Sequence, residues 1–174
     1  MPLAALFHRK SRSAVQALYG AIVAAGRAPV FYEKWGVPDT LDGRFELIAL
    51  HAFLALRRLK HSNECVEFAQ ALFDTMFADL DRNLREMGTG DLGVGRQVKT
   101  MAKAFYGRIL AYEHGLAGDA NLEDALRRNL YGTATPNSGQ VAAAANYLRH
   151  QAQALDAAPV AVLLSGELPL AREA

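Results

Sequence analysis

Charged side chains that could do chemistry gather on two adjacent segments in the middle of this 174-residue chain. The first segment carries an acid-and-arginine face, made of Asp74, Asp79, Asp81, Arg82, Arg85 and Glu86. The second carries a basic stripe, in which Arg96, Lys99 and Lys103 recur at helical spacing. The acid-and-arginine face either locks the two segments through internal pairs or docks another protein. The basic stripe either meets an acidic partner or RNA, or is a solvated helix face.

A glycine pattern between the two segments, Gly88-Thr-Gly90-Asp-Leu-Gly93, matches the literal fingerprint of dinucleotide-binding folds. In that fingerprint the glycines let the backbone approach a pyrophosphate, and they must follow a β-strand. Here the preceding segment has the period of a helix. We therefore interpret these glycines as the end of one helix and the start of the next, with Asp91 as the N-cap.

A calcium site is imitated by Asp79-Leu-Asp81-Arg-Asn83, which resembles the opening of an EF-hand loop. The loop needs glycine at its sixth position and a bidentate acid at its twelfth, where this chain has Leu84 and Gly90. On a helix the two aspartates and the asparagine also point in different directions. The sequence therefore disfavours calcium.

Other catalytic and metal-binding arrangements are also missing. The serines lack the nucleophile-elbow pattern, and no HExxH motif or His-Cys cluster occurs among the five histidines, which are His8, His51, His61, His114 and His150. His51 stands among apolar residues, which is typical of a hydrogen-bonded core histidine. We therefore expect a protein that is not an enzyme and has no catalytic residue, cofactor or metal.

The elements that position these side chains are helices. Apolar residues recur at three- and four-residue steps on both sides of the glycine corner, which predicts a long helical hairpin over residues 64–114. They are Leu72, Phe73, Met76, Phe77, Leu80, Leu84 and Met87, then Val94, Val98, Met101, Phe105, Ile109 and Tyr112. Asn63 can cap the first helix of the hairpin. We expect Gly88, Gly90, Gly93 and Gly95 to supply positive φ angles at the corner.

A second helix, over residues 41–60, is apolar nearly all round and belongs in the middle of a bundle. Either Thr40 or Asp42 caps it. A helix over residues 13–25 precedes it, with Ser13 as N-cap and Gly26 as stop. Shorter helical patterns follow after residue 118 and from residue 141, separated by a loop over residues 132–139.

Three aromatic residues, Phe31, Tyr32 and Trp35, crowd into the irregular stretch between the first two helices. They form either a lid packed on the core or an exposed hydrophobic contact surface. We place the core lid first.

Taken together, the patterns predict an all-α, single-domain bundle of six to seven helices around the central helix 41–60 and the hairpin 64–114. Residues 1–12 are expected to be flexible, residues 13–165 to form the domain, and residues 166–174 to form a tail. The net charge of +1 gives no global reason to bind nucleic acid, and we expect no DNA partner. The lone Cys65 favours a reducing compartment. No continuous apolar run is expected to span a membrane.

Two stretches resemble the ubiquinol-cytochrome c chaperone family. They are FYEKWGVPDTLDGRFELIALHAFLALRRL at 31–59 and ALFDTMFADLDRNLREMGTGDLGVGRQVKTMAKAFYGRILAYE at 71–113. The most specific phrases are VPDTLDGRF, LREMGTGDLGVG and FYGR. The resemblance implies an all-helical, non-enzymatic assembly factor that binds newly made cytochrome b and promotes assembly of respiratory complex III. It also implies a small helper protein or the ribosome as a partner.

The mitochondrial members carry a long arginine-rich presequence that this chain lacks, so we expect a bacterial cytoplasmic member, with peripheral contact at the inner face of the membrane. An RNA or ribosome-binding adaptor that uses the basic helix face is the alternative. The candidate partner or client contacts are Phe31, Tyr32, Trp35, Asp74, Asp81, Arg82, Arg85, Arg96, Lys99, Lys103 and Arg108.

Overall fold

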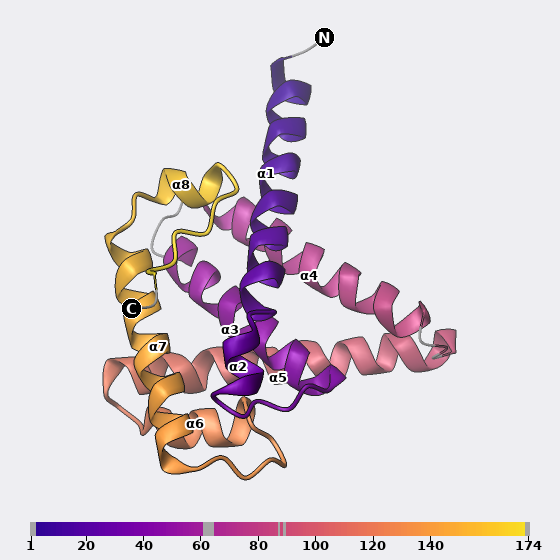
Figure 1. Cartoon of the computed structure of the whole chain (residues 1–174). Helices are drawn as coiled ribbons and strands as arrows, with labels where there is room; N and C mark the ends of the chain where they lie inside the picture. Colours follow the sequence, from indigo (N-terminus) through magenta and orange to yellow (C-terminus); the bar gives the residue numbers. More distant parts are fainter. Residues whose placement is uncertain (1–2, 61–64, 87, 89, 173–174) are drawn as a thin grey trace.

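The computed structural model describes residues 3–60, 65–86, 88 and 90–172, and every regular element within them is a helix (Figure 1). In chain order the helices are α1 (Leu3–Gly26), α2 (Pro29–Glu33), α3 (Leu41–Lys60), α4 (Val66–Glu86), α5 (Asp91–Ala117), α6 (Leu122–Asn129), α7 (Ser138–Ala157) and α8 (Val160–Leu164). The predicted all-α bundle is confirmed. Two of these helices, α2 and α8, are only five residues long.

The central helix is α3, which packs against α1, α4, α7 and α8. Its side chains are buried on nearly every side, as a helix without a polar face requires. Of the two predicted caps, Thr40 is the one observed, because its Oγ1 accepts the Gly43 N–H at 3.2 Å. A Cβ at Gly43 would lie 1.9 Å from the Pro38 carbonyl oxygen, so the loop before α3 can close only on a glycine.

The hairpin of α4 and α5 has the predicted apolar seam, and Leu72, Leu84, Val94 and Phe105 are all buried in it. Its corner differs from the prediction. Only Gly88 has a positive φ, of 85°, whereas Gly90 has φ −62° and is itself the N-cap of α5. The prediction was therefore wrong for Gly90, Gly93 and Gly95 and for Asp91 as N-cap, because α5 already begins at Asp91 and takes up the later glycines.

The dinucleotide-like glycine pattern at this corner follows a helix, α4, and not a strand. This agrees with its interpretation as a helix junction. The predicted Asn63 cap and the predicted apolar residue Met87 lie outside the described residues.

Helix α1 begins at Leu3, so the predicted start at Ser13 was wrong. No proline or glycine separates Pro2 from Gly20, and nothing in the sequence therefore stops the helix from extending toward the N-terminus. The second half of α1 packs on α3 and α4 through Val15, Leu18 and Ile22. The first half projects beyond the other helices, toward the top of Figure 1.

One stretch of the described chain, Ser11–Glu33, is long and apolar enough to cross a membrane by length and composition. The sequence prediction missed it, because this stretch mixes alanine and small residues with few charges and is not one continuous apolar run. The same composition is found in helices that pack on a protein core, and part of α1 does so here.

The C-terminal helices are held by specific polar contacts. Asn137 and Gln140 form a capping box at the start of α7, and Asn121 caps α6. The residues after α8 are also fixed: the Ala171 N–H donates to Gln151 Oε1 at 2.7 Å, and the Gln151 side-chain amide donates back to the Ala171 carbonyl at 3.1 Å. The predicted tail is thus packed against α7 as far as this contact.

Candidate functional site

A cleft of about 920 Å³ lies between the end of α1, α2 with its following loop, the start of α3, and α4. Its floor is apolar and comes from two helices, with Phe45 and Ile48 on α3 and Met76 and Leu80 on α4. Its rim is charged, and the charged residues are Arg27, Glu33, Asp39, Arg44, Asp79 and Glu86. An apolar floor within a charged rim is suited to a partly apolar polypeptide segment.

Two polar contacts fix the rim. The Tyr19 hydroxyl of α1 donates to Asp79 Oδ2 of α4 at 2.9 Å, and burial, together with this bond, raises the pKa of Tyr19. Arg44 Nε and Asp39 Oδ1 pair at 2.6 Å across the loop before α3. The remaining charges on the rim are mostly acidic. The cleft therefore favours a segment that is apolar on one side and basic at its edge.

The aromatic residues between α1 and α3 pack mainly inward. Phe31 is only 2% exposed, and its ring meets those of Trp35 and Tyr147 edge-on, at centroid distances of 4.9 and 5.4 Å. The core-lid alternative therefore holds, and the prediction of Phe31 as a partner contact is wrong. The stretch is also less irregular than predicted, since α2 is a helical turn that directs Phe31 toward α3 and α7. Tyr32 lines the cleft.

The aromatic cluster encloses His51, which is fully buried. Its Nδ1 lies 2.7 Å from the Leu47 carbonyl oxygen, and its Nε2 lies 2.7 Å from the Tyr147 hydroxyl. A carbonyl can only accept, so Nδ1 carries the hydrogen and Nε2 accepts from Tyr147. Burial lowers the pKa of His51 to about 4. The prediction of a hydrogen-bonded core histidine is confirmed, and no metal-binding group of three or more ligands occurs among the described residues.

The acid-and-arginine face lies along α4. Asp81 pairs with Arg85 at 2.7 Å and Asp79 with Arg82 at 3.8 Å, both within one turn of the helix. Asp74 accepts from Gln70 at 2.8 Å. Arg82 and Asp74 are exposed. These contacts support the helix itself, and the face remains a candidate protein-binding surface.

Arg108 does not belong to the basic stripe. Its guanidinium donates two hydrogen bonds to the carboxylate of Glu46, and the two side chains are only 18% and 9% exposed. Burial raises the pKa of Glu46 while Arg108 opposes that effect. The pair joins α5 to α3 and leaves little of the Arg108 side chain exposed to a partner. The sequence could not show this, because 62 positions separate the two residues.

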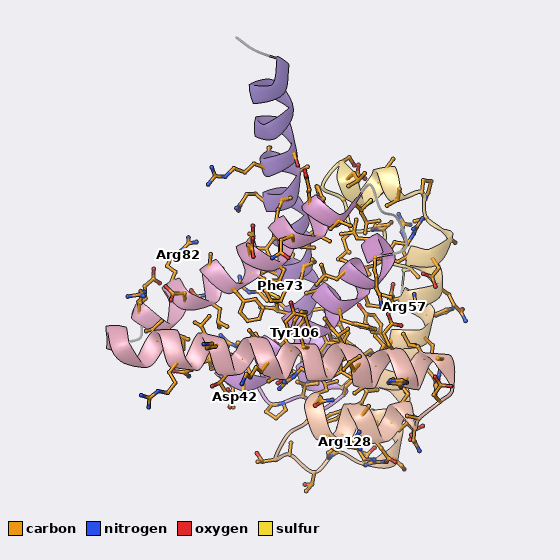
Figure 2. The ribbon with its side chains drawn as sticks, turned by 180° about the vertical axis from the view of Figure 1, so that it is seen from behind. Asp42, Arg57, Phe73, Arg82, Tyr106 and Arg128 are labelled. Atoms are coloured by element: carbon orange, nitrogen blue, oxygen red, sulfur yellow. The ribbon has the colours of Figure 1, made fainter. Side chains whose placement is uncertain are left out.

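The outer face of α5 carries more than the predicted basic stripe. Arg96, Lys99 and Lys103 are exposed, and toward the C-terminus the same side of the helix presents Tyr106 and Leu110, which are 55% and 60% exposed (Figure 2). Sequence reasoning missed Tyr106 and Leu110. The sequence does contain a signal for them, because each directly follows a residue of the predicted apolar seam, Phe105 or Ile109, and the next residue of a helix points to a different side.

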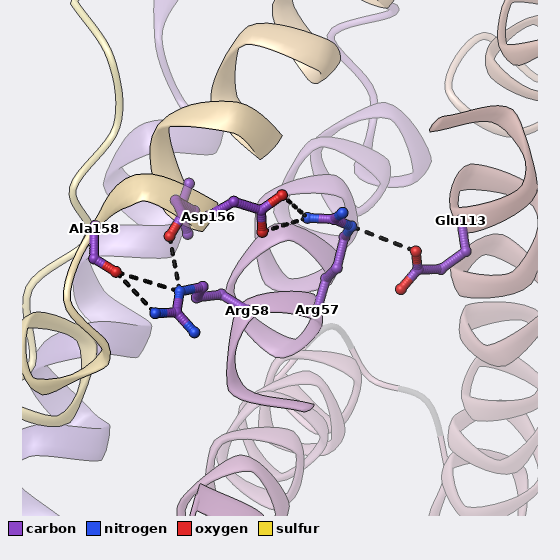
Figure 3. A network of polar contacts seen from close by, with 6 residues as sticks. Arg57, Arg58, Glu113, Asp156 and Ala158 are labelled. Atoms are coloured by element: carbon purple, nitrogen blue, oxygen red, sulfur yellow. Dashed lines mark hydrogen bonds and ion pairs between the residues drawn. The ribbon is translucent and has the colours of Figure 1, made fainter. Parts of the chain in front are cut away.

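Arginines at the end of α3 link three helices (Figure 3). Arg57 pairs with Asp156 of α7 at 2.7 Å and with Glu113 of α5 at 3.4 Å. Arg58 donates to the carbonyls of Leu155 and Ala158, both at 2.9 Å, and so satisfies groups at the end of α7. This network is structural, and it joins the end of α3 to α5 and α7.

Comparison with known proteins adds a family and a set of relatives. The family described as ubiquinol-cytochrome C chaperone matches residues 33–171. Ubiquinol-cytochrome-c reductase complex assembly factor 1 of Xenopus laevis is 28% identical over 141 residues, which are 79% of this chain and 70% of the frog protein. The mouse protein of that name is 26% identical over 162 residues, 91% of this chain. The chain spans 55% of the length of the mouse relative.

A solved structure matches over nearly the whole chain. The crystal structure of the Cbp3 homolog from Brucella abortus is similar with a TM-score of 0.85 at 34% sequence identity, over 98% of this chain and 97% of that one. The arrangement of helices described above is thus shared with a relative of about the same length.

Proposed function

The chain belongs to the ubiquinol-cytochrome C chaperone family, and on that premise we propose that it binds newly made cytochrome b and promotes assembly of the cytochrome bc complex. The family is one of assembly factors for ubiquinol-cytochrome c reductase and not of enzymes. The action proposed here is non-covalent. The protein holds an apolar segment of the client until haem and the other subunits join it.

The observation that carries this proposal is the cleft with its apolar floor. A membrane protein that is not yet assembled exposes apolar segments that it will later bury, and a chaperone must cover such a segment reversibly. The cleft offers Phe45, Ile48, Met76 and Leu80 for this purpose, and its volume suits several side chains of one segment. The charged rim lets the client leave, because a partly wet interface is weaker than a fully apolar one.

The setting of this action is also proposed. We place the protein in the bacterial cytoplasm, in peripheral contact with the inner face of the membrane where the client is inserted. A small helper protein or the ribosome acts as a further partner. The acid-and-arginine face on α4 is the candidate surface for the helper, since Asp74 and Arg82 are exposed there.

The test is deletion of the gene, followed by measurement of assembled cytochrome b from its haem absorbance in membranes. We expect the absorbance to fall and to return when the gene is restored. A restored copy with Leu41→Glu should fail, because Leu41 lines the cleft and is 48% exposed. Val66→Glu is the matched control, since Val66 is also exposed but lies outside the cleft. Unchanged absorbance in the deletion strain would refute the proposed function.

The ribosome-binding adaptor remains a second candidate because Arg96, Lys99 and Lys103 are exposed on one face. The loss of Arg108 from that face leaves three cations to contact phosphates. Binding through these three should weaken steeply with salt. Sedimentation with ribosomes over a salt series tests this, and retention that ignores salt would dismiss it.

A further inference from the structure

We propose that the outer face of α5, formed by Arg96, Lys99, Lys103, Tyr106, Gly107 and Leu110, docks this protein onto a membrane surface that carries anionic lipid headgroups. This inference rests on the proposed function, because it names the surface through which the protein would make the peripheral membrane contact proposed above. The physical argument rests on α5 alone and does not require the cleft to hold a client.

The charge of α5 is the first observation. From residue 92 to residue 112 the chain contains no acidic residue, while it contains Arg96, Lys99, Lys103 and Arg108. Arg108 is occupied by Glu46, but the other three are exposed. In the described part of the chain no ion pair joins any of the three to an acid. Their charges are therefore available to an anionic surface outside the protein.

The apolar residues on the same face are the second observation. Among the residues outside 1–10 and 91–92 whose side-chain exposure is described, four large hydrophobic side chains are exposed, and two of them, Tyr106 and Leu110, lie one turn apart here. Lys99, Lys103, Tyr106 and Leu110 follow one another at steps of four, three and four residues, so they form one line along the helix over roughly 16 Å. The Phe73 ring supports Tyr106 from α4 at a centroid distance of 5.5 Å.

Basic and apolar side chains on one side of a helix are the composition of interfacial helices. The cations attract anionic headgroups from solution, and the apolar side chains then enter the boundary between headgroups and acyl chains. Tyr106 is well suited to that depth, because its ring is apolar and its hydroxyl stays at the polar level.

Gly107 stands between these residues and is exposed. A Cβ added there would meet nothing within 4 Å, so no contact inside the protein requires a glycine. Glycine inside a helix is less favourable than alanine, because it loses more backbone freedom on folding. Its presence on this face fits a close approach between the α5 backbone and whatever covers it.

The arrangement around α5 favours a plane over a groove-shaped partner. Figure 2 shows α5 unobstructed across the view, with Arg82 of α4 on one side of it and Arg128 of α6 on the other. The three exposed cations of α5 suit a flat, mobile anionic surface, whose headgroups rearrange to meet them, whereas Arg82 is already paired with Asp79. Asp42 is also drawn beside α5 in Figure 2, and its negative charge opposes binding to an anionic surface. The attraction therefore depends on the three cations of α5. An RNA partner would not explain the exposed Leu110, because an aliphatic side chain cannot bind a phosphate or hydrogen-bond a base.

The test is co-sedimentation of the full chain with vesicles of phosphatidylcholine alone or mixed with phosphatidylglycerol. Each cation near an anionic surface contributes about fivefold to partitioning, so three should give roughly 100-fold tighter binding to the mixed vesicles. Lys99→Ser with Lys103→Ser should lose about 30-fold of that preference at low salt. Tyr106→Ser with Leu110→Ser should weaken binding to both kinds of vesicle.

The matched control is Lys34→Ser with Lys60→Ser, which removes the same charge from exposed lysines elsewhere and should leave vesicle binding within about twofold of wild type. Far-UV circular dichroism and thermal unfolding confirm that each variant is folded. Equal losses in the control and in the α5 lysine variant would overturn the proposal, since net charge alone would then explain binding. Failure to bind the mixed vesicles would also overturn the proposal. This holds whether or not the protein binds RNA or an acidic protein in a salt-sensitive way.

Discussion

Replacing His51 with phenylalanine should remove most of the dependence of this protein's stability on mildly acidic pH. In the native protein His51 is buried and neutral, with Nδ1–H donating to the Leu47 carbonyl and Nε2 accepting from Tyr147. Its pKa is lowered from 6.5 to about 4 because burial disfavours the imidazolium. In the unfolded chain the same imidazole is free to take a proton at its ordinary pKa.

The direction of the effect follows from this difference. Above about pH 6.5 both states are neutral at this site, and the contribution to stability is fully present. Below that pH the unfolded state binds a proton that the folded state refuses, so stability falls until the native pKa is reached. Each pH unit is worth about 1.36 kcal/mol, and the loss is therefore roughly 2 kcal/mol at about pH 5 and roughly 3 kcal/mol by about pH 4.

Urea unfolding followed by far-UV circular dichroism at about pH 7.5 and about pH 5 measures the two free energies of unfolding. His51→Phe removes this hydrogen bond to the Tyr147 hydroxyl and should cost about 1–3 kcal/mol at about pH 7.5. Between the two pH values it should lose about 2 kcal/mol less than wild type. Tyr147→Phe is the control, because it removes the hydroxyl but leaves the buried imidazole, and it should retain the acid sensitivity. If His51→Phe and wild type lose the same free energy on acidification, the reasoning is wrong.

Other perturbations test the packing around the site by the same unfolding measurement. Arg108→Met should destabilise the protein by about 3–5 kcal/mol, since it leaves the Glu46 carboxylate buried without its partner, and adding Glu46→Leu should recover much of the loss; a double variant as unstable as the single one would contradict this. Gly43→Ala should cost about 1–3 kcal/mol, because its Cβ would meet the Pro38 oxygen, whereas Gly107→Ala should stabilise the helix by about 0.5–1 kcal/mol. Arg58→Ala should cost about 1–3 kcal/mol through the lost bonds to the end of α7, and an unchanged unfolding midpoint would show that water replaces them.

The sequence predicts the parts of this fold that depend on local pattern. Helix α3 is recognisable because its apolar residues leave no polar face, and the sequence restricts its cap to Thr40 or Asp42, of which the structure uses Thr40. The start of α1 could not be placed, since no breaker lies between Pro2 and Gly20 to mark it. The glycine corner was misjudged for the opposite reason. Glycine is a common helix breaker, but α5 is long enough to tolerate Gly93 and Gly95 in its first turns.

The candidate site depends on contacts that no local pattern contains. The cleft takes residues from α1, α2, α3 and α4, and its acid Asp79 is held by Tyr19 from 60 positions away. For the same reason the sequence placed Arg108 among the candidate partner contacts, although its pairing with Glu46 leaves the Arg108 side chain only 18% exposed. The predicted basic stripe itself is exposed as expected. Helical periodicity decides which side chains share a face, but only the tertiary packing decides which face is covered.

The positions of the cleft and of the outer α5 face allow both to act at once. Helices α1 and α2, which border the cleft, lie in front in Figure 1, whereas α5 lies in front when the molecule is turned by 180° in Figure 2. The two surfaces share no residue, and α3 is joined to both, through Phe45 in the cleft floor and through its neighbour Glu46, which holds Arg108 of α5. A membrane against α5 would therefore leave the cleft uncovered, and a client segment in the cleft would not displace the headgroups. Under the two proposals made above, the protein stays at the membrane through α5 while its client binds to the cleft and leaves it.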